Sequence, residues 1–389
     1  MGKRGSVIYN QFEDYIDSIT GAKVTRLTNP DHVSHHMYFY HNMITRDGKK
    51  LLYCAQIDGE RQLYLLDMET GEAVQLTEGA GIEDYSGMLS PDDKYLFYIQ
   101  EKRFMKMNLK TGETDCYYES PQGWKGSSPG PSDDYRYMAI VETKEDTVAV
   151  KHGEGWNFFR ENCLARPLCR IVYIDVENKI SHVVMEEHCW LGHTQIRPHD
   201  PDTILFCHEG PYDVIDARLW LVQSDGSRLR CCRKQPEDLI LTHEFWLPDG
   251  KKFAFVYRET TGKKIENIRM IEPETLEEEI FMECSPYAHF ITSRDGAYMV
   301  GDSQGSDIPI HLLDHTKKEE KKEIQNDFIY IIDVKKKEER RLCYHGTSWK
   351  AIYGNPQDAH PHPFFTNDNR YVIFTSDKDG MPALYRAEV

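Results

Sequence analysis

Asp249-Gly250-Lys251-Lys252-Phe253-Ala254-Phe255-Val256-Tyr257 combines a turn signal with an apolar run. An Asp-Gly pair in front of a strand-like apolar run is typical of a tight hairpin turn. The same unit occurs six more times, about 45 residues apart where no insertion intervenes, which indicates an internal repeat. The other turns stand at Asp47-Gly48, Asp92-Asp93, Asp133-Asp134, Pro201-Asp202, Asp295-Gly296 and Asp368-Asn369.

Each unit continues beyond its first hairpin. In the first unit a third strand, Gln62–Asp67, is followed by a turn and a fourth strand, Ala73–Thr77. Seven units of four strands predict an all-β fold, a seven-bladed β-propeller. The two longest units hold insertions near residues 143–169 and 302–327. The second insertion contains the charge run Lys317–Glu323, which we expect to be a solvated loop.

The two ends of the chain are predicted to share a blade. The last unit ends at Leu384–Val389, one strand short of four, and Ala22–Thr28 resembles the fourth strand of other units. We expect this N-terminal strand, about residues 22–28, to pair with the C-terminal blade, about 357–389. The pairing would close the ring of a single domain, residues 1–389, and remove exposed sheet edges.

Composition narrows the class of partner and the compartment. The chain carries 64 acidic and 47 basic residues, a formal charge of −17. This excludes nucleic acid as a general partner, because such affinity depends on many Lys and Arg contacts to phosphate. No apolar run is long enough to span a membrane, and no signal peptide is visible. The ten cysteines are scattered without a C-x-x-C pair, so we expect reduced thiols and a cytoplasmic protein.

A histidine pair near the C-terminus predicts part of a metal site. The stretch Asn355-Pro-Gln-Asp-Ala-His-Pro-His-Pro-Phe-Phe365 places Gln357, His360 and His362 close together. The prolines on either side of His362 forbid a helix, and in an extended chain two residues at i and i+2 share a face. Two imidazoles and an amide oxygen suit a borderline divalent metal. The alternative is an edge strand that carries surface histidines.

The repeats bring further histidines to the same place. In a propeller the strand before each Asp-Gly turn is the innermost, so residues six before each turn are predicted to meet at one mouth of the central channel. In blade four, His193 takes the earlier place that His360 takes in blade seven. The alternative is a set of polar residues that hold water in the channel. Counting back from the seven turns gives His41, Ser86, Ser127, Gln195, His243, His289 and His362.

The connection from His208 to Arg218 in blade four is predicted to open at the same mouth. A guanidinium there suits a carboxylate ligand. Arg218 could instead form a structural ion pair with Asp213 or Asp216. His41, His193 and His208 are candidate substrate-binding residues of this mouth.

With these residues located, the chain resembles the oligogalacturonate lyases of the pectate-lyase type, a family of seven-bladed propellers. The resemblance implies a divalent metal, usually manganese, on His289, Gln357, His360 and His362. It also implies His243 as catalytic base, Arg218 as an essential arginine, and a small acidic oligosaccharide as substrate. The resemblance spans nearly the whole chain and is carried by Gly21–Thr28, Tyr38–Tyr40, Gln75–Gly79, Leu89–Asp93, His208–Pro211, His243–Trp246 and Gln357-x-x-His360-x-His362.

The implied reaction is β-elimination of an α-1,4-linked galacturonate, in the degradation of pectin. The proton on C5 is weakly acidic because it is α to the C6 carboxylate. The metal and Arg218 would offset the carboxylate charge, and His243 would remove the proton. The product would be a 4,5-unsaturated uronate. The sequence does not indicate the proton donor to the leaving O4, the preferred chain length or an oligomeric state.

Two other classes of function remain open at this point. Gly126-Ser-Ser-Pro-Gly130 matches the G-x-S-x-G motif of hydrolases, but it opens an inner strand and contains Pro129, so the strand-to-helix turn of a nucleophile elbow is not expected. A non-enzymatic propeller that binds a sugar or a peptide is the second alternative, because the fold hosts many functions. His243 would then be a core histidine beside Trp246. Tight metal binding at the mouth would separate the lyase from both.

Overall fold

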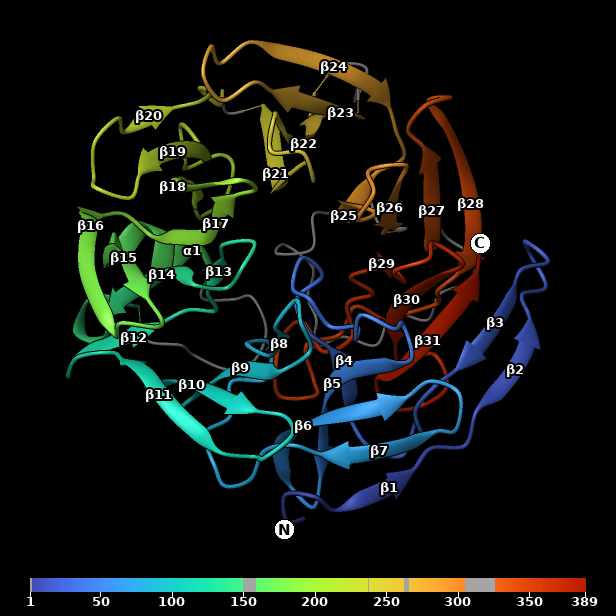
Figure 1. Cartoon of the computed structure of the whole chain (residues 1–389). Helices are drawn as coiled ribbons and strands as arrows, with labels where there is room; N and C mark the ends of the chain where they lie inside the picture. The colour runs from blue at the N-terminus through green and yellow to red at the C-terminus, as the bar shows by residue number, and fades with distance from the viewer. Residues whose placement is uncertain (1, 150–158, 237, 262–265, 305–325) are drawn as a thin grey trace.

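Seven antiparallel sheets stand in a ring around a central axis, as the computed structural model shows (Figure 1). The structure describes residues 2–149, 159–236, 238–261, 266–304 and 326–389. The charge run 317–323 lies outside these ranges. The chain is a seven-bladed β-propeller, as the repeats predict.

The first three blades follow the chain from the N-terminal side. Blade one contains, from the centre outward, β4 (Ser34–His36), β5 (Lys50–Ile57), β6 (Glu60–Asp67), β7 (Glu72–Gln75) and β1 (Val7–Tyr9). Blade two contains β8 (Met88–Leu89), β9 (Tyr95–Gln100), β10 (Arg103–Asn108) and β11 (Thr114–Glu119). Blade three contains β12 (Trp124–Gly126) and β13 (Gly130–Pro131), both on β14 (Tyr137–Lys144), then β15 (Leu168–Asp175) and β16 (Ile180–His188). The short helix α1 (Phe159–Ala165) precedes β15.

Blades four to six have four strands each. Blade four contains β17 (Leu191–Arg197), β18 (Asp200–His208), β19 (Leu219–Gln223) and β20 (Arg230–Cys231). Blade five contains β21 (Leu239–Trp246), β22 (Phe253–Glu259), β23 (Glu266–Ile271) and β24 (Glu278–Glu283). Blade six contains β25 (Tyr287–Thr292), β26 (Tyr298–Ser303), β27 (Phe328–Asp333) and β28 (Glu338–Tyr344).

Blade seven joins the two ends of the chain (Figure 1). Its sheet runs from β29 (Phe364–Phe365) through β30 (Tyr371–Ser376) and β31 (Ala383–Glu388) to β3 (Lys23–Arg26) and β2 (Glu13–Ile16). β3 pairs antiparallel with β31, with Val24 opposite Ala387. The N-terminal strand therefore lies in the C-terminal sheet, and β2 adds a further strand outside it, as β1 does in blade one.

Packing between blades explains the apolar runs that follow each turn. A strand in the middle of a blade has a neighbouring blade on each face, so both faces are buried. In β5 all five residues from Leu51 to Ala55 are 0% exposed. Burial on both faces removes the polar alternation of a half-exposed strand, and each run reads as continuous hydrophobic sequence.

The turn of blade four lies three residues earlier than predicted. β17 ends at Arg197 and β18 begins at Asp200, so Pro198 and His199 form the turn, and Pro201 and Asp202 belong to β18. His199 has a positive φ of 64°, close to the 66° of Gly250 in blade five. Here a histidine holds a backbone conformation that usually favours glycine, so sequence pattern alone misplaced the turn.

In blade one a short segment leaves the sheet. His36 is still paired with Tyr53, and Met43 accepts a hydrogen bond from the Leu52 amide, so residues 37–42 are an insertion into the innermost strand. They lie against the centre of the ring, where the Phe39 ring contacts histidines of three other blades.

All ten cysteines lie within the described ranges and all are unpaired. Of the helices that the structure describes, none has the length and apolar character needed to cross a bilayer.

Candidate functional site

Three histidines from blades six and seven converge at one mouth of the ring. One ring nitrogen of each of His289, His360 and His362 lies within 4.8 Å of the corresponding nitrogens of the other two. All three residues are buried: His289 is 6%, His360 3% and His362 1% exposed. Three buried imidazoles in this arrangement are typical of a site for a divalent transition metal.

A buried carboxylate orients His289. The innermost strand β25 has a bulge, since Tyr287 is opposite Ser303 and His289 is opposite Asp302. Asp302 is 0% exposed, and its Oδ2 lies 2.8 Å from His289 Nδ1. A carboxylate can only accept a hydrogen bond, so Nδ1 carries the proton and the lone pair is on Nε2. Such carboxylate–histidine pairs fix the tautomer of metal-binding histidines.

His362 presents a buried nitrogen for which the described residues offer no hydrogen-bond acceptor or donor. Its Nε2 is inaccessible and unpaired among them, which costs about 1–3 kcal/mol when nothing satisfies the atom. Its backbone N–H donates to Asp302 at 3.1 Å, and the Phe39 ring stacks on the imidazole with centroids 5.6 Å apart. The donor set and the orphaned nitrogen fit a bound metal ion.

His243 lies beside this cluster, at a bulge in β21. The ladder shifts by one residue between Thr242 and Phe245, and His243 has a positive φ of 55°. Its ring is 4.7 Å from the His289 ring between centroids, and its Nδ1 is 2.7 Å from Thr242 Oγ1. Burial, and then the proximity of His289, lowers the pKa of His243 well below its usual 6.5. The imidazole is therefore neutral at neutral pH and can accept a proton.

In a regular strand Glu244, directly after His243, would point away from the site, and the same bulge changes this. Glu244 accepts a hydrogen bond from Arg218 Nε at 2.8 Å, and its residue is 2% exposed. An extra residue in the strand breaks the two-residue period, so His243 and Glu244 both belong to the site.

Arg218 is held between two buried carboxylates. Besides Glu244, Glu209 Oε1 lies 2.7 Å from Arg218 Nη1. The alternative structural partners are engaged elsewhere: Asp213 pairs with Arg160 and Asp216 with Lys234. Arg218 thus stays at the mouth of the ring with its fork fixed in one orientation.

His193 in blade four completes this group. It stands in the same bulge position of β17 as His243 in β21, with a positive φ of 52°. Its Nδ1 lies 3.2 Å from Glu244 Oε1 and 3.4 Å from Arg218 Nη2. Burial by itself would raise the pKa of Glu244, but Arg218 and His193 together lower it to about 2. The carboxylate is therefore ionised throughout the neutral range.

Several of these residues line one cavity of about 180 Å³. It adjoins a larger cavity of about 800 Å³ over blades two to four, with which it shares lining residues. Residues that line both are Tyr38, Phe159, His193, Glu209 and Gln357. The smaller cavity is lined in addition by Arg218, His243, His289 and His360.

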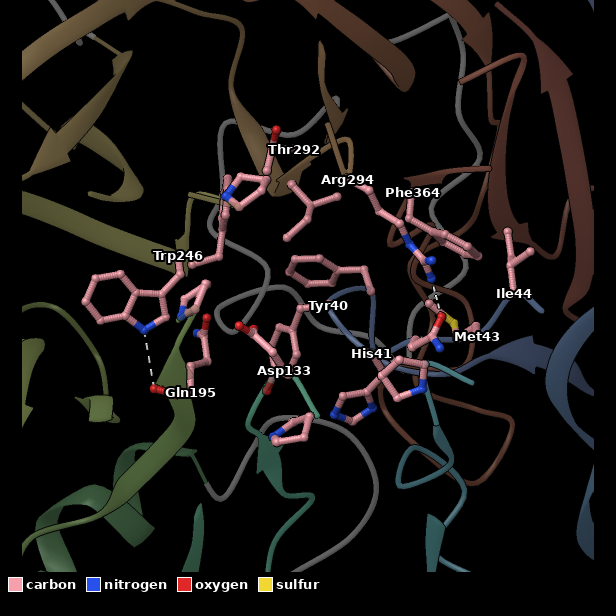
Figure 2. A pocket seen from close by; sticks show the side chains of 18 of the residues that line it. Tyr40, His41, Met43, Ile44, Asp133, Gln195, Trp246, Thr292, Arg294 and Phe364 are labelled. Atoms are coloured by element: carbon pink, nitrogen blue, oxygen red, sulfur yellow. Dashed lines mark hydrogen bonds between the residues drawn. The ribbon is translucent and has the colours of Figure 1, made fainter. Parts of the chain in front are cut away.

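His41 and His208 do not join the cluster. His41 lines a separate cavity of about 620 Å³ at the side of the Asp-Gly turns, with Trp246 and Arg294 (Figure 2). Counting back from the turn reached His41 because residues 37–42 are an insertion. His208 stacks on Trp220 with centroids 4.6 Å apart, and its Nε2 is 3.5 Å from Glu187.

Sequence reasoning missed the carboxylates of the site, Glu209, Glu244 and Asp302. Asp302 stands in the strand Tyr298–Ser303, whose other inner residues are apolar or small, and a charge in such a strand is a usable signal because it needs a buried partner. Glu244 had no such signal, since the bulge that turns it inward is not visible in the sequence.

The hydrolase motif lacks the required surroundings. Gly126 ends β12 and Gly130 begins β13, so the two serines connect strands of one sheet. No α-helix follows them within residues 131–149. The strand-to-helix turn of a nucleophile elbow is therefore absent from this described part of the chain.

Comparison with known proteins agrees with this geometry. The profile of the oligogalacturonate lyase family matches residues 1–389. An oligogalacturonide lyase of Pectobacterium atrosepticum is 39% identical, over 99% of this chain and 98% of its own. An oligogalacturonate lyase of Dickeya dadantii is 38% identical over the same shares. A solved oligogalacturonate lyase in complex with manganese superposes with a TM-score of 0.90 at 38% identity, over 99% of this chain and 98% of that one. The chain therefore belongs to the oligogalacturonate lyase family.

Proposed function

We propose that this protein cleaves short α-1,4-linked galacturonate oligomers by β-elimination to 4,5-unsaturated uronates, in the degradation of pectin, with Mn²⁺ as its metal. The observation that carries the proposal is the convergence of three buried histidine nitrogens within 4.8 Å beside His243 and Arg218. A relative of the same fold and 38% identity is known in complex with manganese.

The proposed metal ligands are His289, Gln357, His360 and His362. All four are neutral, so a divalent ion would keep its full charge for an anionic substrate. When bound, the ion supplies a Lewis acid that offsets the charge of a uronate carboxylate.

The proposed roles of the remaining residues follow from their contacts. Arg218, fixed by Glu209 and Glu244, would hold the C6 carboxylate and stabilise the negative charge that develops as C5 loses its proton. His243 is neutral at neutral pH and would remove that proton. His193, within reach of Arg218, would contact the sugar in the smaller cavity. The larger cavity gives space for the rest of the oligomer.

The carboxylates argue against a glycoside hydrolase at this mouth. Hydrolysis needs a pair of carboxyl groups of which one is protonated at working pH. For both Glu209 and Glu244 burial would raise the pKa, but Arg218 reverses this and lowers it. Neither is available as the protonated acid of such a pair, whereas elimination needs a base at C5 and a proton for the leaving O4, but no pair of carboxyl groups.

The decisive experiment is an assay on digalacturonate. We expect ultraviolet absorbance of the unsaturated uronate to rise, to stop after EDTA treatment, and to return with Mn²⁺. The masses of the two products should add up to that of the substrate without water. Addition of water across the broken bond would identify a hydrolase, and metal binding without any turnover would identify a binding module.

The domain organisation and the compartment are proposals of the same kind. We propose one domain over residues 1–389, supported by the pairing of β3 with β31. We propose a cytoplasmic location, supported by ten unpaired thiols.

A further inference from the structure

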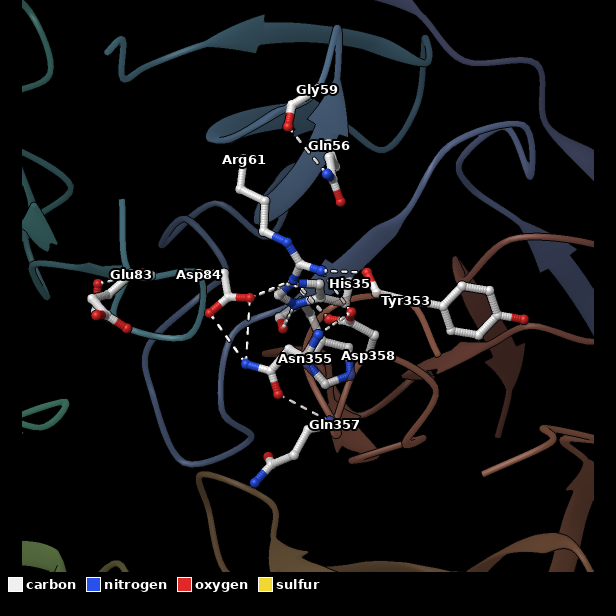
Figure 3. Close-up of polar contacts among 12 residues, drawn as sticks. His35, Gln56, Gly59, Arg61, Glu83, Asp84, Tyr353, Asn355, Gln357 and Asp358 are labelled. Carbon is white, nitrogen blue, oxygen red and sulfur yellow. Dashed lines mark hydrogen bonds and ion pairs between the residues drawn. The ribbon is translucent and has the colours of Figure 1, made fainter. Parts of the chain in front are cut away.

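Arg61, on β6 of blade one, reaches across to the loop that carries two of the proposed metal ligands (Figure 3). Its Nη2 donates to Asp358 Oδ2 at 2.6 Å and its Nη1 to Asp358 Oδ1 at 2.7 Å. Nη1 also pairs with Asp84, which precedes blade two. The carboxylate of Asp358 is 0% exposed and that of Asp84 is 13% exposed. Bidentate pairs of this kind form two parallel, charge-assisted hydrogen bonds, which are strong and fix the relative orientation of the two side chains.

Asp358 lies between two proposed ligands in the sequence, directly after Gln357 and two residues before His360. It also accepts the backbone N–H of Asn355 at 2.9 Å, and Arg61 Nη2 donates to the carbonyl of Tyr353 at 2.9 Å. One guanidinium therefore binds two points of this segment, Tyr353 and Asp358, and Asp358 in turn holds Asn355.

This fixation matters because the segment has no sheet to hold it. Between the end of β28 at Tyr344 and the start of β29 at Phe364 the chain forms no strand. Its first part is held by Asp377, which accepts the Ser348 amide at 2.7 Å and the Tyr353 hydroxyl at 2.8 Å. Its later part is held by single contacts from blades six and seven, such as the Thr375 amide on the Pro361 carbonyl and Asp302 on the His362 amide, and by blade one.

Blade one makes a second contact with the same loop. His36 Nε2, on β4, lies 3.0 Å from the carbonyl oxygen of Pro361, the residue between His360 and His362. Arg61 and His36 thus hold the chain on either side of His360.

The cluster around Arg61 is not a second metal site. One ligand atom each of His35, Asp84 and Asp358 lies within 4.8 Å of the others. However, Arg61 Nη1 is 3.2 Å from His35 Nε2 and contacts both carboxylates. The guanidinium occupies the place that a metal cation would take, so the two carboxylates are already neutralised by the positive charge of Arg61.

We propose that Arg61, Asp84 and Asp358 are positioning residues that place Gln357 and His360 for metal binding, so that metal affinity depends on an ion-pair network outside the ligand set. This rests on the proposed metal site. Residues that orient metal ligands from outside typically change affinity by ~10–100-fold when altered.

The test is the affinity of metal-free protein for Mn²⁺, measured by calorimetry and by loss of the electron paramagnetic resonance signal of free Mn²⁺. We expect Arg61→Met to weaken binding by ~10–100-fold. Asp84→Asn removes the charge of the more exposed partner, so it should weaken Mn²⁺ binding less than Arg61→Met does. It also provides a second variant to measure if Arg61→Met does not fold.

A matched control comes from blade three. Arg170 and Glu142 form a buried pair with N–O distances of 2.7 and 2.8 Å. Their side chains are 15% and 0% exposed, as those of Arg61 and Asp358 are. Neither residue lines the cavities of the site. Arg170→Met should lower the melting temperature like Arg61→Met but leave Mn²⁺ affinity unchanged.

Three outcomes overturn the proposal. Wild-type affinity in both Arg61→Met and Asp84→Asn would show that the network does not position the ligands. An equal loss of affinity in Arg170→Met would show that general destabilisation explains the effect. If the wild-type protein binds no Mn²⁺, the proposed metal site itself fails, and this outcome is recognised before any variant is compared.

Discussion

Arg218 Nε donates to Glu244 Oε2 across 2.8 Å, and this contact joins the proposed arginine to the residue next to the proposed base. Glu244 follows His243 in β21 and would face away from it in a regular strand. The bulge in that strand lets His243 line the cavity while the Glu244 side chain reaches Arg218. The proposed base and the proposed arginine are therefore linked through neighbouring residues of one strand, since Arg218 binds Glu244 and Glu244 follows His243.

We expect Arg218→Lys to lower kcat/KM by at least ~10²-fold, the range for loss of one charge-stabilising donor. Lysine keeps the charge but lacks the planar guanidinium. A single ammonium group cannot contact Glu209 and Glu244 and at the same time bind a substrate carboxylate in a bidentate way. The ultraviolet assay on digalacturonate measures the loss. Arg228→Lys, on an exposed pair with Glu274, should stay within a few-fold of wild type. Equal activity of Arg218→Lys would remove Arg218 from the substrate carboxylate.

Glu244→Gln should change how stability depends on pH. The pKa of Glu244 is about 2 in the folded protein against its usual 4.5. A carboxylate with a lowered folded-state pKa stabilises the fold above its unfolded-state pKa, and this stabilisation is lost as pH falls toward the folded-state value. The stability difference between wild type and Glu244→Gln should therefore be largest above pH 4.5 and shrink toward pH 2. Urea unfolding at several pH values measures it, and a constant difference would contradict the expectation.

Asp302→Asn should weaken metal binding by ~10–100-fold. In the native protein Asp302 accepts hydrogen bonds from the backbone N–H groups of both His289 and His362. The asparagine carbonyl can still accept from His289 Nδ1, but the asparagine NH2 group would then point at one of these N–H groups, donor against donor. Competition with a chelator gives the affinity. An unchanged affinity would show that Asp302 serves the bulge alone.

Much of the architecture was predictable because propeller blades repeat their turns. Gly48, Gly250, Gly296 and Asn369 all have the positive φ that their turn signals indicate. The regular spacing of these turns predicts the ring of blades. It also predicts that His243, His289 and His362, each six residues before a turn, lie close together. In blade four the register failed, because His199 takes the turn position without a glycine signal.

Contacts that depend on irregular backbone could not be predicted. His41 was misplaced by the insertion at residues 37–42, and the contact of Glu244 with Arg218 depends on a bulge that no sequence pattern indicates. The pairing of Arg61 with Asp358 joins residues nearly 300 positions apart, and no local pattern encodes it. Strand periodicity describes regular ladders, whereas a site of this kind is built where the ladders are interrupted.

As pH is lowered, the activity of the enzyme should begin to fall only below about pH 6.5. Burial, and then His289 and Arg218, lowers the pKa of His243 well below that value, and the base is inactive only when protonated. We expect kcat/KM at saturating Mn²⁺ to be level from pH 7.5 to about 6.5 and to fall only at lower pH. Half-maximal activity at or above pH 6.5 would mean that another group or an unperturbed histidine is the base.

His243→Ala should separate binding from chemistry. The proposed ligands come from blades six and seven, and His243 Nδ1 contacts Thr242 on its own strand in blade five, so the metal site does not require the His243 side chain. Metal content and affinity for digalacturonate should therefore remain near wild type. Turnover should fall by ~10²–10⁴-fold, the usual contribution of a general base. Thr242→Val removes the partner of Nδ1 but leaves the imidazole, so its loss should be smaller. If His243→Ala loses its metal, the residue belongs to the ligand set. If it turns over normally, the proton on C5 is removed by a different group.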